Sequence, residues 1–138
     1  MPHKPKTFKP RWMQTATKQS RTLARKRYDA ERGSAAERGY DARWQKFRKW
    51  LLRQPEFAVC GDCTLPTKHI DHIDAVEDAN DSGFYALHNL QPLCAGCHAR
   101  KTIRHDGGYG RKSGDAAALE AMRVAARRRA EAIEARGL

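Results

Sequence analysis

The segment that decides the fold opens with Cys60-Gly-Asp-Cys63 and closes with Cys94-Ala-Gly-Cys97, two cysteine pairs separated by 30 residues. Each Cys-x-x-Cys turn places two sulfurs on one side, with backbone amides pointing at them, and two such turns complete a closed tetrahedral site that suits structural zinc. Disulfides or ordinary buried cysteines are the alternatives, but a chain without secretory features favours metal. A closed site has no open coordination position, so this zinc is not expected to be the catalytic metal.

Short elements are predicted around the two cysteine pairs. Residues 56–73 read as a turn and a short strand pair, and residues 74–83 form an acidic loop. Residues 84–93 carry the chain back, and a helix is expected from about Ala95 to before Gly107, where glycines break it. The segment from Phe57 to Arg104 is 48 residues long. At that length an apolar core alone gives marginal stability, so a metal is also needed.

A helix ending near Arg53 is predicted upstream, with Asp41 as its N-cap. Its apolar residues recur at helical spacing on one face, which we expect to pack into the core: Tyr40, Trp44, Phe47 and Leu51. Its cations lie largely off that face and are expected to face outward, where they can contact phosphates of a polyanion: Arg43, Lys46, Lys49 and Arg53.

Two basic extensions flank this centre. Residues 1–37 are expected to be a basic, largely disordered arm, although a short helix around Thr22–Ala30 is compatible with the sequence. Residues 111–138 are expected to hold a C-terminal basic helix that is solvated or depends on a partner, because large apolar residues are few there. The central domain is therefore assigned to residues 38–110.

The charge of the 138-residue chain is +11 and is unevenly distributed. Residues 1–55 carry 16 basic and 4 acidic residues, whereas residues 56–106 carry 4 basic and 8 acidic ones. Segregated positive charge indicates a polyanion binder, most often of nucleic acid, with a solvated tail or an anionic membrane surface as alternatives. No run of 18 apolar residues and no secretory signal is present, so we expect a cytoplasmic protein.

Polar residues whose side chains could bind a metal or take part in catalysis lie next to the cysteine pairs. Asp71 and His72 end the predicted strand, His98 follows Cys97 directly, and Asn89 lies on the connection between them. The two halves of the zinc site are therefore expected to anchor one polar constellation. His69 shares the strand face of Asp71 by two-residue alternation, and its contact with metal or phosphate is left open. Lys101 and Arg104 follow His98 as phosphate contacts or solvated charges.

At these residues the chain resembles the HNH endonucleases, especially the small phage-type group. The matching stretches are Asp71-His72-Ile73 and Asn89-Leu-Gln-Pro-Leu-Cys-Ala-Gly-Cys-His-Ala-Arg-Lys-Thr102, with Arg38-Gly-Tyr-Asp-Ala-Arg-Trp44 upstream. The resemblance covers about residues 38–110. Family members often carry a proline shortly after Asp-His-Ile, where this chain has Asp74-Ala75, a departure that bears on the shape of the loop.

The resemblance implies an α+β fold, the ββα-metal finger, here stabilised by a four-cysteine zinc and flanked by basic helices. It implies that His72 is the general base, that Asp71 and His98 bind one catalytic divalent cation, and that Asn89 orients the loop and hairpin. A neutral imidazole with a pKa near 6.5 can take a proton from water at pH 7. The cation could be Mg²⁺, Mn²⁺, Ni²⁺ or Zn²⁺, since one ligand is an imidazole.

The implied activity is metal-dependent nicking or cutting of double-stranded DNA with little sequence specificity. The resemblance further implies a role in phage DNA packaging with terminase or portal proteins, inside a bacterial host cell, with a restriction-type role as the alternative among enzymes. A non-catalytic zinc-knuckle module that binds nucleic acid would explain the cysteines and the charge equally well. A basic adaptor that binds a protein partner is the third interpretation.

Overall fold

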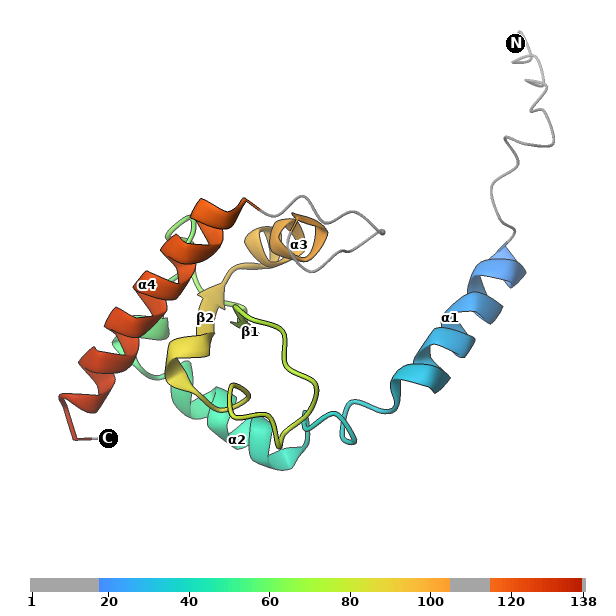
Figure 1. The fold of residues 1–138 in the computed structure, drawn as a ribbon, viewed down its shortest axis with the longest axis horizontal. Coiled ribbons are helices and arrows are strands. Elements are labelled where there is room, and N and C mark those ends of the chain that lie inside the picture. The colour runs from blue at the N-terminus through green and yellow to red at the C-terminus, as the bar shows by residue number, and fades with distance from the viewer. Residues whose placement is uncertain (1–17, 105–114, 138) are drawn as a thin grey trace, which may run out of the picture. The chain divides into compact units, whose positions relative to one another are not determined.

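The structure is a computed structural model that describes residues 18–104 and 115–137 (Figure 1). The chain divides into two compact units, residues 1–34 and residues 35–138, and each is described by itself. In the first unit, α1 (Lys18–Arg32) is a 15-residue helix, longer than the Thr22–Ala30 segment that the sequence suggested. Gly33, with φ of 75°, follows its last residue, which is the left-handed conformation that commonly ends a helix.

The second unit begins with α2 (Ala42–Leu51), which forms as predicted. The Asp41 carboxylate caps it by accepting hydrogen bonds from the amides of Arg43 (2.9 Å) and Trp44 (3.1 Å). The helix is followed by the short 3-10 helix η2 (Pro55–Phe57). Trp44 and Leu51 are buried in the main core, and the predicted apolar face of the helix is confirmed.

A ββα unit follows. Strands β1 (His69–His72) and β2 (Leu90–Leu93) pair antiparallel, with Asp71 opposite Gln91, and the short helix η3 (Leu87–Asn89) leads into β2. Helix α3 (Ala95–Arg104) packs on both strands. The fold class is therefore α+β, as predicted, with the hairpin and α3 arranged as in a ββα-metal finger.

Helix α4 (Ala116–Glu134) departs from the prediction of a solvated or partner-dependent helix. It packs on η3, β2 and η2, and Figure 1 shows it running alongside the hairpin. Ala126 and Ile133 are 0% exposed, and Ile133 belongs to the main core. The alanines have small side chains, so the helix approaches the hairpin closely and needs few large apolar residues to be buried.

The acidic loop before β2 packs against the start of the second unit. Gly39 has a φ of 91°, and a Cβ at this position would lie 2.6 Å from the Cβ of Ala79. Only glycine fits both the backbone conformation and the contact. No helix among the residues that the structure describes is long and apolar enough to span a membrane.

Candidate active site and zinc centre

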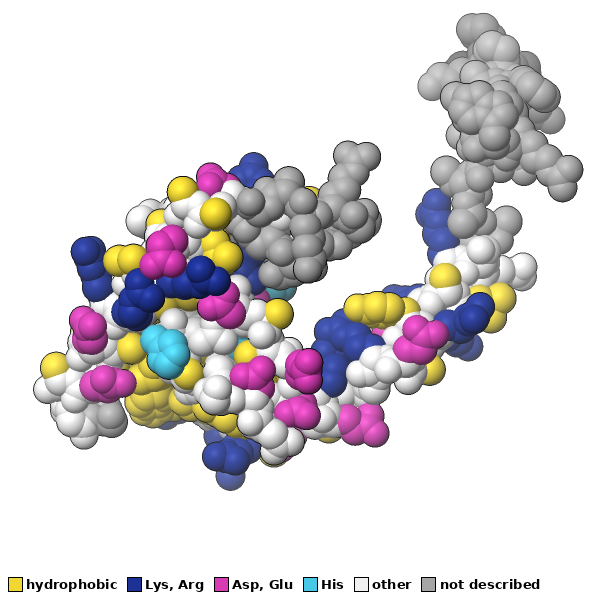
Figure 2. Space-filling view, viewed as in Figure 1, with side chains coloured by type: hydrophobic (Ala, Val, Ile, Leu, Met, Phe, Trp, Pro, Cys, Tyr) yellow, Lys and Arg dark blue, Asp and Glu magenta, His cyan; other side chains and the backbone are white. Residues whose placement is uncertain are grey.

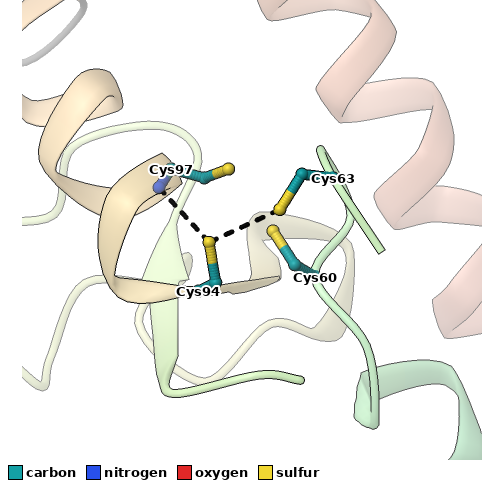
Figure 3. A group of neighbouring side chains, drawn as sticks. All are labelled: Cys60, Cys63, Cys94 and Cys97. Atoms are coloured by element: carbon teal, nitrogen blue, oxygen red, sulfur yellow. Dashed lines mark hydrogen bonds between the residues drawn. The ribbon is translucent and has the colours of Figure 1, made fainter. Parts of the chain in front are cut away.

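The four cysteines come together as predicted. Their sulfurs all lie within 4.8 Å of one another, and none of the four is in a disulfide (Figure 3). A tetrahedral zinc with Zn–S bonds of about 2.3 Å needs sulfurs about 3.8 Å apart. The Cys63 and Cys94 sulfurs are 3.5 Å apart, close to that spacing. The quartet is therefore positioned to hold a structural metal such as zinc.

Neighbouring groups change the pKa values of the cysteine thiols. The backbone amide of Cys97 donates to Cys94 Sγ at 3.4 Å, and this contact lowers the pKa of the Cys94 thiol to about 7. Asp62 and the neighbouring sulfurs raise the pKa of Cys97, so metal binding must release a proton from that thiol. Arg100 donates to Cys97 Sγ at 2.9 Å and to Asp62 at 3.4 Å, which sets a positive charge against this cluster.

The second cluster lies on one face of β1. The strand alternates, so His69 and Asp71 are partly exposed on one side while Ile70 and His72 are buried on the other. His98 from α3 reaches the exposed side, and its Nε2 lies 3.7 Å from Asp71 Oδ1. The structure thus brings together the two residues predicted to bind the catalytic cation.

His69 joins this cluster through His98. The two imidazole rings are stacked, with centroids 4.5 Å apart and planes at 16°. The prediction that His69 shares the face of Asp71 is confirmed. Burial and the nearby charge of His98 lower the pKa of His69.

Lys101 corrects a prediction. From the sequence we predicted that Lys101 contacts phosphate or is a solvated charge, but its side chain is only 4% exposed. Its Nζ lies 3.0 Å from Asp71 Oδ2 and donates to the backbone carbonyl of His72 at 2.8 Å. Gln91, opposite Asp71 in the hairpin, also donates to Oδ2 at 3.3 Å. Both groups hold one carboxylate oxygen and leave Oδ1 facing His98.

His72 is buried, whereas Asp71, its neighbour on β1, is partly exposed. Its ring stacks on Trp44 at 5.3 Å, and Nε2 lies 2.8 Å from the Phe84 carbonyl. A carbonyl only accepts, so Nε2 carries the proton and Nδ1 keeps a lone pair in the neutral ring. Burial lowers the pKa of His72, which favours that neutral form at pH 7.

Asn89 ties the loop to the hairpin. Its Oδ1 accepts from the Asp74 amide at 2.8 Å, and its Nδ2 donates to the carbonyls of Asp74 (3.2 Å) and Gly83 (3.1 Å). The side chain is 6% exposed and therefore bridges the two ends of the loop from inside the fold. These bonds are what a residue that orients the loop requires.

The remaining cations predicted to bind DNA are exposed on the surface: Arg43, Lys46, Lys49, Arg53 and Arg104. The face seen in Figure 2 mixes basic and acidic side chains over α4, where Glu120 pairs with Arg123 and Arg127. Sequence reasoning missed Arg48, which donates to the Lys68 carbonyl at 2.7 Å just before β1. Its position four residues after Trp44, on the core-facing side of α2, was the available signal.

Residues 59–104 match the family model described as HNH endonuclease. The chain carries an HNH endonuclease domain. The matched segment contains both cysteine pairs and the residues of the β1 cluster, whereas α2 and α4 lie outside it. No curated protein and no solved structure matched the chain.

A catalytic cation is typical of HNH domains, and the residues present fit one. Asp71 Oδ1 and His98 Nε2 are 3.7 Å apart, and both atoms can lie at ligand distance, about 2.0–2.2 Å, from a single divalent ion. One carboxylate and one imidazole leave the other coordination positions to water and phosphate oxygens. This donor set admits Mg²⁺ but suits Mn²⁺, Ni²⁺ or Zn²⁺ at least as well.

Proposed function

We propose that the protein is a metal-dependent DNA endonuclease that hydrolyses phosphodiester bonds in double-stranded DNA. The observation that supports this most is the convergence of Asp71 Oδ1 and His98 Nε2 at 3.7 Å within the HNH domain. A zinc-knuckle module that only binds nucleic acid has no need of an oriented carboxylate and imidazole. The proposal therefore accounts for more of the domain than binding alone.

Each side chain has a separate task in this reaction. A divalent cation, when bound by Asp71 and His98, supplies neutralisation of the negative charge that develops on the phosphate. Lys101 and Gln91 fix the Asp71 carboxylate through Oδ2, so that Oδ1 keeps its direction. Asn89 holds the loop that carries Phe84, whose carbonyl fixes the tautomer of His72.

The neutral His72 is the general base in this proposal. Its Nδ1 takes a proton from water, the water oxygen bonds to phosphorus, and the bond from phosphorus to the 3′-oxygen breaks. The leaving oxygen takes a proton from solvent. The products are a 5′-phosphate and a 3′-hydroxyl end, so the reaction balances without a redox step.

DNA is held through its phosphates rather than its bases. The exposed cations of α2 and the arginines of α1 supply positive charge that can neutralise DNA phosphates. In this proposal they do not form a fixed set of hydrogen-bond donors that would recognise particular bases. Such contacts position an enzyme but carry no sequence information. Weak sequence preference is therefore part of the proposal.

We also propose a biological setting from the family resemblance of the sequence. It is phage DNA packaging with terminase or portal proteins, in the cytoplasm of a bacterial host, where thiols stay reduced and available to zinc. A restriction-type role is the alternative among enzymes. Co-purification with a terminase subunit supports the first role, and protection of host DNA by methylation supports the second.

Nicking of supercoiled plasmid by the zinc-loaded protein tests the activity. We expect nicking with added Mn²⁺, none with EDTA, and a loss of about 10²-fold or more in Asp71→Asn. Asp78→Asn is the matched control, because it removes the same charge from the acidic loop outside the cluster. DNA binding by all three proteins without any nicking would favour the zinc-knuckle binding module.

A further inference from the structure

His69 contacts the Asp71–His98 cluster through the face of its ring. Its imidazole stacks on His98 with centroids 4.5 Å apart and an interplanar angle of 16°. The His98 side chain is 37% exposed, so solvent lies along part of this ring. His69 therefore covers one face of the His98 ring, while part of the His98 side chain meets solvent.

The geometry argues against His69 as a further metal ligand. Within residues 18–104 and 115–137, the cysteine quartet is the only group of three or more His, Cys, Asp or Glu side chains placed so that it could hold a metal ion. His69, Asp71 and His98 are thus not placed as a three-ligand group. The lone pair of an imidazole nitrogen lies in its ring plane, so two rings stacked face to face direct their lone pairs along separate planes.

We propose that His69 is a positioning residue, which holds the His98 ring by stacking so that Nε2 stays directed at Asp71 Oδ1. This inference rests on the proposed function for its catalytic meaning. The backbone positions both rings. Two-residue alternation along β1 puts His69 on the same face as Asp71, and Cys97, which directly precedes His98, holds the start of α3 at the cysteine quartet. One ring on the strand and one on the helix then meet face to face.

Phenylalanine separates stacking from nitrogen chemistry at this position. His69→Phe keeps a flat ring and removes both nitrogens, whereas His69→Ala removes the ring. Residues that orient a metal ligand typically cost about 10–100-fold in metal affinity or activity when they are replaced. We expect that decrease in Mn²⁺ affinity for His69→Ala, measured by calorimetry on zinc-loaded protein, with most of it recovered in His69→Phe.

A spectroscopic measurement tests the stack without metal or activity. The carbon-bound ring protons of His98 feel the ring current of the stacked side chain, so their NMR shifts should move in His69→Ala and stay displaced in His69→Phe. Zinc content and circular dichroism confirm that both variants fold. The inference is overturned if His98 shifts are unchanged in His69→Ala, or if His69→Phe loses Mn²⁺ affinity as fully as His69→Ala.

The two proposals fail separately. A wild-type protein that binds Mn²⁺ but never nicks DNA refutes the proposed function, while the affinities and shifts of the His69 variants still decide the stacking role. Nicking by wild type with normal Mn²⁺ affinity in His69→Ala refutes the positioning role alone.

Discussion

Replacing Lys101 by methionine should destabilise the second unit strongly. The Lys101 side chain is 4% exposed, and its ammonium contacts two acceptors, Asp71 Oδ2 at 3.0 Å and the His72 carbonyl at 2.8 Å. Removing one partner of a buried ion pair costs about 3–5 kcal/mol, because the other charge is left uncompensated. Asp71 is 16% exposed and regains some water, so we expect a decrease of about 3 kcal/mol in the free energy of unfolding.

The assay is urea or thermal unfolding of zinc-saturated protein. A decrease of about 3 kcal/mol should lower Tm by roughly 10–20 °C in a unit of this size. Arg104→Met is the matched control, since it removes the same charge from an exposed position on the same helix, and its effect should stay within about 0.5 kcal/mol. Equal stability of the two variants would refute the interpretation of Lys101 as the buried partner of Asp71.

Three further predictions concern metal, backbone and charge. Cys94→Ser should leave the HNH domain unfolded and zinc-poor, because structural zinc contributes about 10–16 kcal/mol at neutral pH; native reduced protein without zinc by elemental analysis would contradict this. Gly39→Ala should lower the free energy of unfolding by about 3 kcal/mol, because φ is 91° and the new Cβ would lie 2.6 Å from the Cβ of Ala79. Gly96→Ala in α3 is the control: a Cβ there meets open space, so the change should be neutral or stabilising in the same chemical unfolding experiment. Deleting residues 1–33 should weaken DNA binding and flatten its salt dependence, by about 0.9 in log–log slope for each DNA phosphate that the arm neutralises; an unchanged slope would assign the arm to something other than DNA.

The local elements could be predicted because their signals are local. Trp44 and Leu51 fall on one helical face, Asp41 caps the helix, and the paired cysteine turns fix where the hairpin and α3 meet. Two-residue alternation on a strand was enough to place His69 with Asp71. These features depend on residues that are close in the sequence or on a motif of fixed spacing.

The burial of α4 and Lys101 could not be predicted in the same way. The sequence of α4 shows few large apolar residues, and its packing depends on alanines meeting a surface formed by distant segments. A lysine on a helix after His98 resembles a solvated charge until Asp71 is found beneath it. The stacking partner of His69 is likewise a contact between β1 and α3 that no periodicity encodes.

Matched measurements on His72→Ala and His98→Ala test the central assignment most directly. Calorimetry gives the Mn²⁺ affinity of each zinc-loaded variant, and a plasmid assay gives its nicking rate. We expect His72→Ala to keep its metal affinity and lose about 10²–10⁴ in rate, and His98→Ala to lose metal affinity, with activity returning at high Mn²⁺. The account is contradicted if His72→Ala loses the metal while His98→Ala keeps it, or if both variants nick DNA at the wild-type rate.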